Sequence, residues 1–132
     1  MTRIDHIGIA TKSIDQALPF WEALGFKPTG GGIVEEQGVE VRYMSNDSDS
    51  RIELLEPTGP DTPVGKFIEK RGEGIQQMAI SVSDINETIG TLTDMGVKMI
   101  NSEPQIGHGG KKIAFIHPSS AGGVLIELVE SN

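Results

Sequence analysis

Four polar residues stand inside apolar, β-branched stretches of the sequence, where they could do chemistry out of reach of solvent. They are one histidine, one glutamine and two glutamates: His6, Glu53, Gln77 and Glu127. A buried carboxylate without a partner destabilises a protein by several kcal/mol. Two carboxylates and a histidine that meet in one place therefore need a cation. One nitrogen and three oxygen donors suit Co²⁺, Mn²⁺, Zn²⁺, Ni²⁺ or Mg²⁺, with positions left open for water or substrate.

Each of these residues also has an ordinary structural interpretation. A glutamate on a strand usually faces solvent, and we expect Glu56 and Glu130 to do so. A single histidine on an apolar strand is more often a hydrogen-bonded structural residue than a metal ligand. The metal interpretation gains weight because the four candidates occupy matching positions of an internal repeat.

The repeat is visible when the sequence is laid on itself. At an offset of 71, residues 4–10 fall on residues 75–81, and the register continues until Gly25 meets Gly96. Near the end of each half, residues 52–56 match residues 126–130 at an offset of 74, after a three-residue insertion in the second half. The repeat therefore aligns His6 with Gln77 and Glu53 with Glu127.

Each copy is expected to begin with a strand and to end with several more. Residues 4–10 and 75–82 are typical of strands, because apolar and β-branched residues alternate or run on between polar ends. The other expected strands are residues 39–44 and 51–55 in the first copy, and residues 98–100, 112–117 and 124–129 in the second.

A helix is expected after the first strand of each copy. Apolar residues recur there at helical spacing, with Ser13 and Ser83 as N-caps and Gly25 and Gly96 as C-terminal glycines. Pro19 lies inside the first of these helices and should kink it. Between the copies, Pro63 can open a short helix that ends near residue 71.

These elements predict an α+β fold made of two tandem βαβββ modules. Residues 1–57 and 74–132 form the modules, and residues 58–73 form the linker. Because a module of this size buries little core alone, the two modules should pack together, so that residues 1–132 form a single domain. Matching positions then converge on a shared pseudo-twofold axis, which would bring the four candidates to one metal cleft.

Composition narrows the function classes. The chain has 132 residues, a formal net charge of −8 and no cysteine. The absence of cysteine excludes disulfides, thiolate catalysis and cysteine-ligated metals. The negative charge argues against nucleic-acid partners. No apolar run reaches the length of a membrane span and no signal peptide is recognisable, so a cytoplasmic location is expected.

The paired modules with polar residues on matching strands resemble the vicinal oxygen chelate superfamily, which includes glyoxalase I. Within it, the chain looks like a methylmalonyl-CoA epimerase over nearly its whole length. The segments that carry the resemblance are residues 4–10, 36–39, 52–57, 72–75, 103–104, 107–110, 114–118 and 123–128. The part from the glycine loop through His117-Pro118 to the last strand is the most specific.

The resemblance implies a glyoxalase-like fold and a metal-dependent epimerisation of (2R)- and (2S)-methylmalonyl-CoA, in which an α-proton is removed and a divalent metal stabilises the enolate. Carried over residue by residue, the metal ligands are His6, Glu53, Gln77 and Glu127, with Co²⁺ first and Zn²⁺, Ni²⁺ or Mn²⁺ as other choices. Glu127 is then one catalytic acid–base group. We hypothesise that Glu53 is its counterpart, because the pseudo-twofold axis would place it across the metal. The resemblance also implies an acyl-CoA substrate and a homodimer.

One departure from the family leaves other activities open. Similar epimerases carry His-His where this chain has Gln76-Gln77, so an amide oxygen replaces an imidazole at the Gln77 position. The resulting donors resemble those of glyoxalase I with the halves exchanged. A lactoylglutathione lyase acting on a hemithioacetal is therefore an alternative, and a non-catalytic small-molecule-binding protein of the same fold is another.

Overall fold

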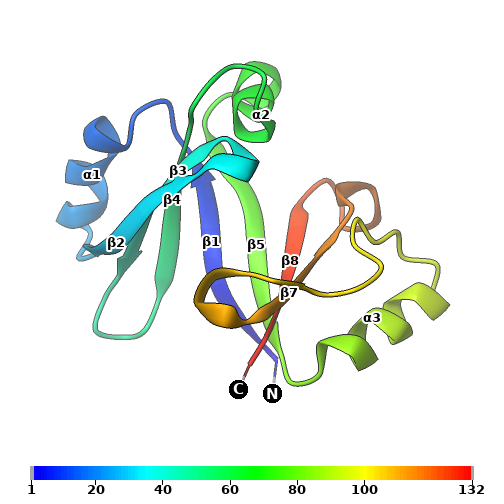
Figure 1. Ribbon diagram of the computed structural model, residues 1–132. Helices are drawn as coiled ribbons and strands as arrows, with labels where there is room; N and C mark the ends of the chain where they lie inside the picture. Colours follow the sequence, from blue (N-terminus) through cyan, green and yellow to red (C-terminus); the bar gives the residue numbers. More distant parts are fainter. Residues whose placement is uncertain (1, 132) are drawn as a thin grey trace. The chain divides into compact units, whose positions relative to one another are not determined.

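The computed structural model describes residues 2–131 and divides them into two compact units (Figure 1). We call residues 6–76 the N-terminal unit, and residues 2–5 together with 77–131 the C-terminal unit. Each unit follows the order strand, helix and three strands. The predicted α+β fold of two βαβββ repeats is confirmed.

In the N-terminal unit the strands lie in the order β2-β3-β4-β1. Strand β1 runs parallel to β4, and the pairs β2-β3 and β3-β4 are antiparallel. The elements are β1 (Arg3–Ala10, from His6 onwards), α1 (Ile14–Ala23), β2 (Lys27–Val34), η1 (Glu35–Gln37), β3 (Val39–Ser45), β4 (Arg51–Pro57) and α2 (Pro63–Arg71).

The C-terminal unit repeats this ladder in the order β5-β8-β7-β6. Strand β5 runs parallel to β8, and the other two pairs are antiparallel. The elements are β5 (Gly74–Val82, from Gln77 onwards), α3 (Ile85–Asp94), β6 (Gln105–Ile106), η2 (His108–Gly110), β7 (Lys112–Ile116), η3 (Pro118–Ser120) and β8 (Leu125–Glu130).

Both faces of the N-terminal sheet carry apolar residues, but helices cover them unequally. Helix α1 packs on one face, around the buried side chains Ile14, Met44, Ile52 and Leu54. On the other face, α2 contributes Val64 to a cluster with Ala10, Val39, Val41 and Leu55. This cluster lies toward one end of the strands. The opposite end of the same face, around Glu53, is left without a helix of this unit.

The C-terminal sheet has one helix, α3, on one face. Its Ile85 and Ile89 pack with strand residues of even number, among them Ala114, Ile116 and Leu128. Side chains alternate along a strand, so the odd-numbered residues of β5, β7 and β8 lie on the other face. No helix of this unit covers that face. In each unit, part of one sheet face thus carries no helix of that unit.

The helix ends are mostly as the sequence predicts. The Ser13 hydroxyl caps α1 by accepting from the Gln16 N–H at 3.2 Å. The predicted cap Ser83 is wrong, because the Asp84 carboxylate caps α3 by accepting from the Glu87 N–H at 3.0 Å. A carboxylate is also the better acceptor beside the positive end of a helix.

Two strands were not expected from the sequence, and one expected strand is absent. Strand β2 contains three consecutive glycines, which are unfavourable in strands by propensity. Its pairing with β3 requires one of them, because a Cβ on Gly31 would lie 2.1 Å from the Val41 carbonyl oxygen. The expected strand at residues 98–100 is absent, because these residues form only a single bridge, between Met99 and Ile116. The second unexpected strand, β6, has only two residues.

No helix among residues 2–131 is both long enough and apolar enough to cross a membrane.

Candidate active site

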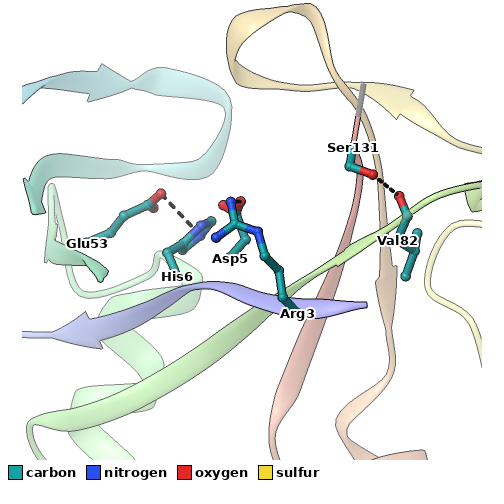
Figure 2. A network of polar contacts seen from close by, with 6 residues as sticks. All are labelled: Arg3, Asp5, His6, Glu53, Val82 and Ser131. Atoms are coloured by element: carbon teal, nitrogen blue, oxygen red, sulfur yellow. Dashed lines mark hydrogen bonds and ion pairs between the residues drawn. The ribbon is translucent and has the colours of Figure 1, made fainter. Parts of the chain in front are cut away.

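The first polar pair lies on the part of the N-terminal sheet face that carries no helix of this unit. Gly8 of β1 is paired with Glu53 of β4, so His6, two residues before Gly8, shares a face with Glu53. The glycine has no side chain that could stand between them. The imidazole Nε2 of His6 lies 3.1 Å from Oε2 of Glu53 (Figure 2). His6 is 9% exposed, so this contact is largely shielded from water.

The C-terminal unit repeats this register with different side chains. Ala79 of β5 is paired with Glu127 of β8, so Gln77, two residues before Ala79, shares a face with Glu127. The residue between them is again small, and Ala79 is fully buried. Each unit therefore presents one polar residue and one glutamate on the same face, at matching positions, as the repeat in the sequence predicts.

Glu127 has a strongly altered acidity. Burial, and to a smaller extent the negative charge of Asp5, raise the pKa of Glu127 to about 7. Desolvation and a nearby like charge both disfavour the ionised carboxylate. Asp5 lies near Arg3, with 3.8 Å between the guanidinium and the carboxylate (Figure 2). A carboxyl group with this pKa can both accept and donate a proton near neutral pH.

An aromatic residue stands beside each glutamate. Tyr43 of β3 is paired with Glu53, and Phe115 of β7 is paired with Glu127. Paired residues of antiparallel strands have Cβ atoms about 5 Å apart on the same face. Neither aromatic is among the residues predicted from the sequence. The signal was present, because residues 43 and 115 occupy corresponding strands of the two copies.

The two glutamates expected to face solvent have structural roles instead. Glu56 accepts from the Ile14 N–H at 2.7 Å, and Glu130 accepts from the Ile85 N–H at 3.0 Å. Each carboxylate thus binds a backbone donor in the first turn of α1 or α3, where negative charge stabilises the helix. On β4, Glu53 lies on the sheet face opposite to that of Glu56. On β8, Glu127 likewise lies on the face opposite to that of Glu130.

The four candidate donors are of types that bind divalent cations, and the spacing of one pair, His6 and Glu53, is compatible with a shared cation. Two ligand atoms bound at right angles to one cation, each at about 2.1 Å, are about 3 Å apart. The His6 and Glu53 atoms at 3.1 Å match that spacing. Among all the residues that the structure describes, no three His, Asp or Glu side chains form a group that could hold a metal ion. Each unit supplies two of the four candidate donors.

Comparison with known proteins gives the family. The sequence pattern of the Glyoxalase/Bleomycin resistance protein/Dioxygenase superfamily matches residues 5–115. The chain belongs to this superfamily. It is 32% identical over 131 residues to the mitochondrial methylmalonyl-CoA epimerase of Homo sapiens, covering 98% of this chain and 74% of the human protein.

Two other proteins are more similar to this chain, and the match covers more of their length. The uncharacterized protein YqjC of Bacillus subtilis is 43% identical, with 98% of this chain and 93% of that protein covered. A methylmalonyl-CoA epimerase solved in complex with methylmalonyl-CoA and NH₄⁺ has a TM-score of 0.88 at 40% identity, covering 99% of this chain and 95% of that one. The resemblance in the sequence to methylmalonyl-CoA epimerases is thereby confirmed.

Proposed function

We propose that this protein is an epimerase that interconverts (2R)- and (2S)-methylmalonyl-CoA by removing and returning the α-proton. The observation that carries the proposal is Glu127, a buried carboxyl group on the same sheet face as Gln77. It belongs to a chain that is 40% identical, over 99% of its length, to an epimerase solved with methylmalonyl-CoA. Proton transfer at carbon needs an ionisable group of this kind beside the reacting atom. Without a cation, burial raises the pKa of Glu127 to about 7, and a cation bound to the carboxylate would lower it.

The reaction needs two proton-transfer groups on opposite faces of the α-carbon. Glu127, as carboxylate, takes the α-proton and leaves the electron pair delocalised onto the thioester carbonyl oxygen. An acid on the other face then delivers a proton to the same carbon, which inverts its configuration. We assign this second role to Glu53, which occupies the position related to Glu127 by the repeat.

We also propose a divalent metal site formed by His6, Glu53, Gln77 and Glu127. The spacing of His6 Nε2 and Glu53 Oε2 supports it, as does the matching register of Gln77 and Glu127. A bound cation would supply Lewis-acid stabilisation of the negative charge that develops on the substrate oxygens. We prefer Co²⁺, with Zn²⁺, Ni²⁺ or Mn²⁺ as the other choices.

Glu53 would then serve as both ligand and acid–base group, and conservative variants separate the two roles. Glu53→Gln keeps an oxygen donor but removes the acidic proton. Glu53→Ala removes both. If Glu53 is a proton-transfer group, Glu53→Gln retains metal and loses epimerisation. If it is only a ligand, Glu53→Gln retains both.

A stereochemical assay tests the activity itself. The metal-loaded protein is incubated with pure (2S)-methylmalonyl-CoA, and formation of the 2R form is followed with a 2R-specific mutase. The hemithioacetal of glutathione and methylglyoxal serves as the alternative substrate. We expect turnover of methylmalonyl-CoA only. Turnover of the hemithioacetal alone would make the protein a lactoylglutathione lyase, and binding without turnover of either would make it a binding protein.

The domain organisation, oligomeric state and location of the protein are also proposed here. We propose that residues 1–132 act as a single domain and that the protein is a cytoplasmic homodimer. Light scattering coupled to size-exclusion chromatography measures the mass of the assembly. Twice the 14.1 kDa of one chain is the expected result, and the mass of a single chain would contradict it.

A further inference from the structure

A cleft of about 430 Å³ lies in the N-terminal unit between α1 and the end of β1. Ile9 and Leu54, which line it, belong to the face that packs on α1, whereas His6 and Glu53 belong to the other face. The cleft is therefore separate from the candidate active site. Its volume falls in the range of about 300–1,000 Å³ that is usual for small-molecule sites.

One wall of the cleft is aromatic. Phe20 and Trp21 of α1 line it, with their rings in edge-to-face contact at 5.1 Å between centroids. Trp21 makes a second such contact with Phe26 at 6.1 Å. Phe20 is 62% exposed, so most of its ring is open to a ligand. Covering this ring with an apolar ligand would remove apolar surface from water.

The other end of the cleft holds a fixed negative charge. Oε2 of Glu73 accepts from the Lys12 backbone N–H at 2.7 Å and from the Thr11 hydroxyl at 3.1 Å. Thr11 is 6% exposed, so the group that orients the carboxylate is itself anchored. These two hydrogen bonds hold the pKa of Glu73 below its usual range. Among residues 2–131, no hydrogen bond is made to the other oxygen, Oε1, which remains available to a ligand.

The charges around the cleft favour a positively charged ligand over a negatively charged one. None of the residues that line it is a lysine, arginine or histidine. The Lys12 side chain is exposed and is not part of the lining, although its positive charge is a minor cause of the lowered pKa of Glu73. The first turn of α1 offers little to an anion, because the Ile14, Gln16 and Ala17 N–H groups are bound by Glu56 and Ser13. An acyl-CoA, with its phosphates, does not fit such a site.

We propose that this cleft binds a small primary-ammonium ligand with an aromatic or branched aliphatic tail. The ammonium group meets Oε1 of Glu73, and the tail covers Phe20 and Trp21. This inference does not depend on the proposed epimerase activity. It assigns to the N-terminal unit a second ligand site that the C-terminal unit lacks in sequence, because Val82, Thr91 and Leu92 stand at the positions of Thr11, Phe20 and Trp21.

The chain's single tryptophan makes the cleft directly observable. Trp21 is the only tryptophan, so fluorescence excited selectively in tryptophan, and not in Tyr43, reports on this site. Phenethylamine, which is protonated at pH 7, is titrated into the wild-type protein, with phenylacetate as the anion of similar size. We expect a saturable change with phenethylamine at a dissociation constant of about 1 mM or below, and none with phenylacetate. Equal responses to both compounds, or no saturable response to the amine, would overturn the proposal.

Two variants that each remove one negative charge provide a matched comparison. Glu73→Gln removes the charge but keeps an acceptor for Thr11 and Lys12, and it should weaken phenethylamine binding about tenfold or more. Asp15→Asn removes a charge from the exposed first turn of α1 outside the lining, and it should leave binding unchanged. Similar weakening in both variants would show a general charge effect and overturn the assignment to Glu73. The wild-type comparison of amine and acid remains decisive even if Glu73→Gln folds poorly.

Discussion

The two units have the same backbone frame but place different partners beside their glutamates. In the N-terminal unit, Glu53 lies 3.1 Å from the imidazole of His6. In the C-terminal unit, the same register pairs Glu127 with the neutral amide Gln77, and burial raises the pKa of Glu127 to about 7. An imidazole can carry a positive charge or donate to a carboxylate, whereas an amide cannot be charged. The duplicated frame thus places Glu53 beside a side chain that can carry a charge and Glu127 beside one that cannot.

The largest expected effect comes from removing the proton-exchanging group. Glu127→Gln keeps the shape and an oxygen donor but cannot take a proton. Epimerisation of methylmalonyl-CoA should fall by about 10³-fold, within the usual range for a general acid–base group. Initial rates measured with the mutase-coupled assay, at equal metal content, check this. A variant with more than a tenth of the wild-type rate would remove Glu127 from the mechanism.

The raised pKa of Glu127 also predicts how stability depends on pH in metal-free protein. Between about pH 4.5 and 7 the folded state holds a proton on Glu127 that the unfolded state has lost. The free energy of unfolding contributed by this group therefore falls as pH rises through that window. The loss should be about 3 kcal/mol, at about 1.4 kcal/mol per pKa unit.

Denaturant unfolding in EDTA at pH 5 and pH 8 measures this effect. Glu127→Gln should lose less stability than wild type over this interval, and Asp5→Asn should show a smaller improvement because Asp5 is the minor cause of the shift. Equal pH dependence of wild type and Glu127→Gln would contradict the raised pKa.

Making the C-terminal pair like the N-terminal pair should change metal affinity. Gln77→His replaces an amide oxygen with an imidazole, which binds Co²⁺ and Zn²⁺ more strongly. We expect affinity to rise about tenfold or more, measured by competition with a chromophoric chelator. His6→Gln is the reciprocal change and should lower affinity. If neither variant alters affinity, the two side chains are not ligands of the same ion.

The smallest effects are expected where the two units are most alike. Glu56→Ala and Glu130→Ala each remove a carboxylate from the first turn of a helix, at Ile14 and Ile85. Each should lower the free energy of unfolding by about 1–2 kcal/mol. Epimerase activity should be unchanged, because these side chains lie on the other face from Glu53 and Glu127. Thermal or denaturant unfolding with activity assays checks both statements.

The sequence predicted the parts of the fold that depend on local pattern and on the repeat. The first strand of each copy, the Ser13 cap and the helix beginning at Pro63 all have local signals, and the structure contains them. Strand β2 could not be predicted in this way. Its glycines are poor strand formers, and the pairing with β3 that stabilises it comes from residues further along the chain.

The candidate site was predicted as a set of residues but not as an electrostatic environment. Matching positions in the repeat pointed to His6, Glu53, Gln77 and Glu127, and the register within each unit places each pair on one face. The pKa of Glu127 depends on burial and on Asp5, which is distant in sequence. The roles of Glu56 and Glu130 at helix N-termini likewise depend on contacts more than 40 positions apart.

Exchange of the α-hydrogen of methylmalonyl-CoA in D₂O, followed by proton NMR, tests the central claim most directly. The account predicts loss of the α-hydrogen signal with Co²⁺-loaded wild-type protein, much slower loss in EDTA, and no loss above background with Glu127→Gln. The signal reports proton removal alone, so it does not depend on the later steps. Persistence of the signal with folded, Co²⁺-loaded wild-type protein would contradict the account.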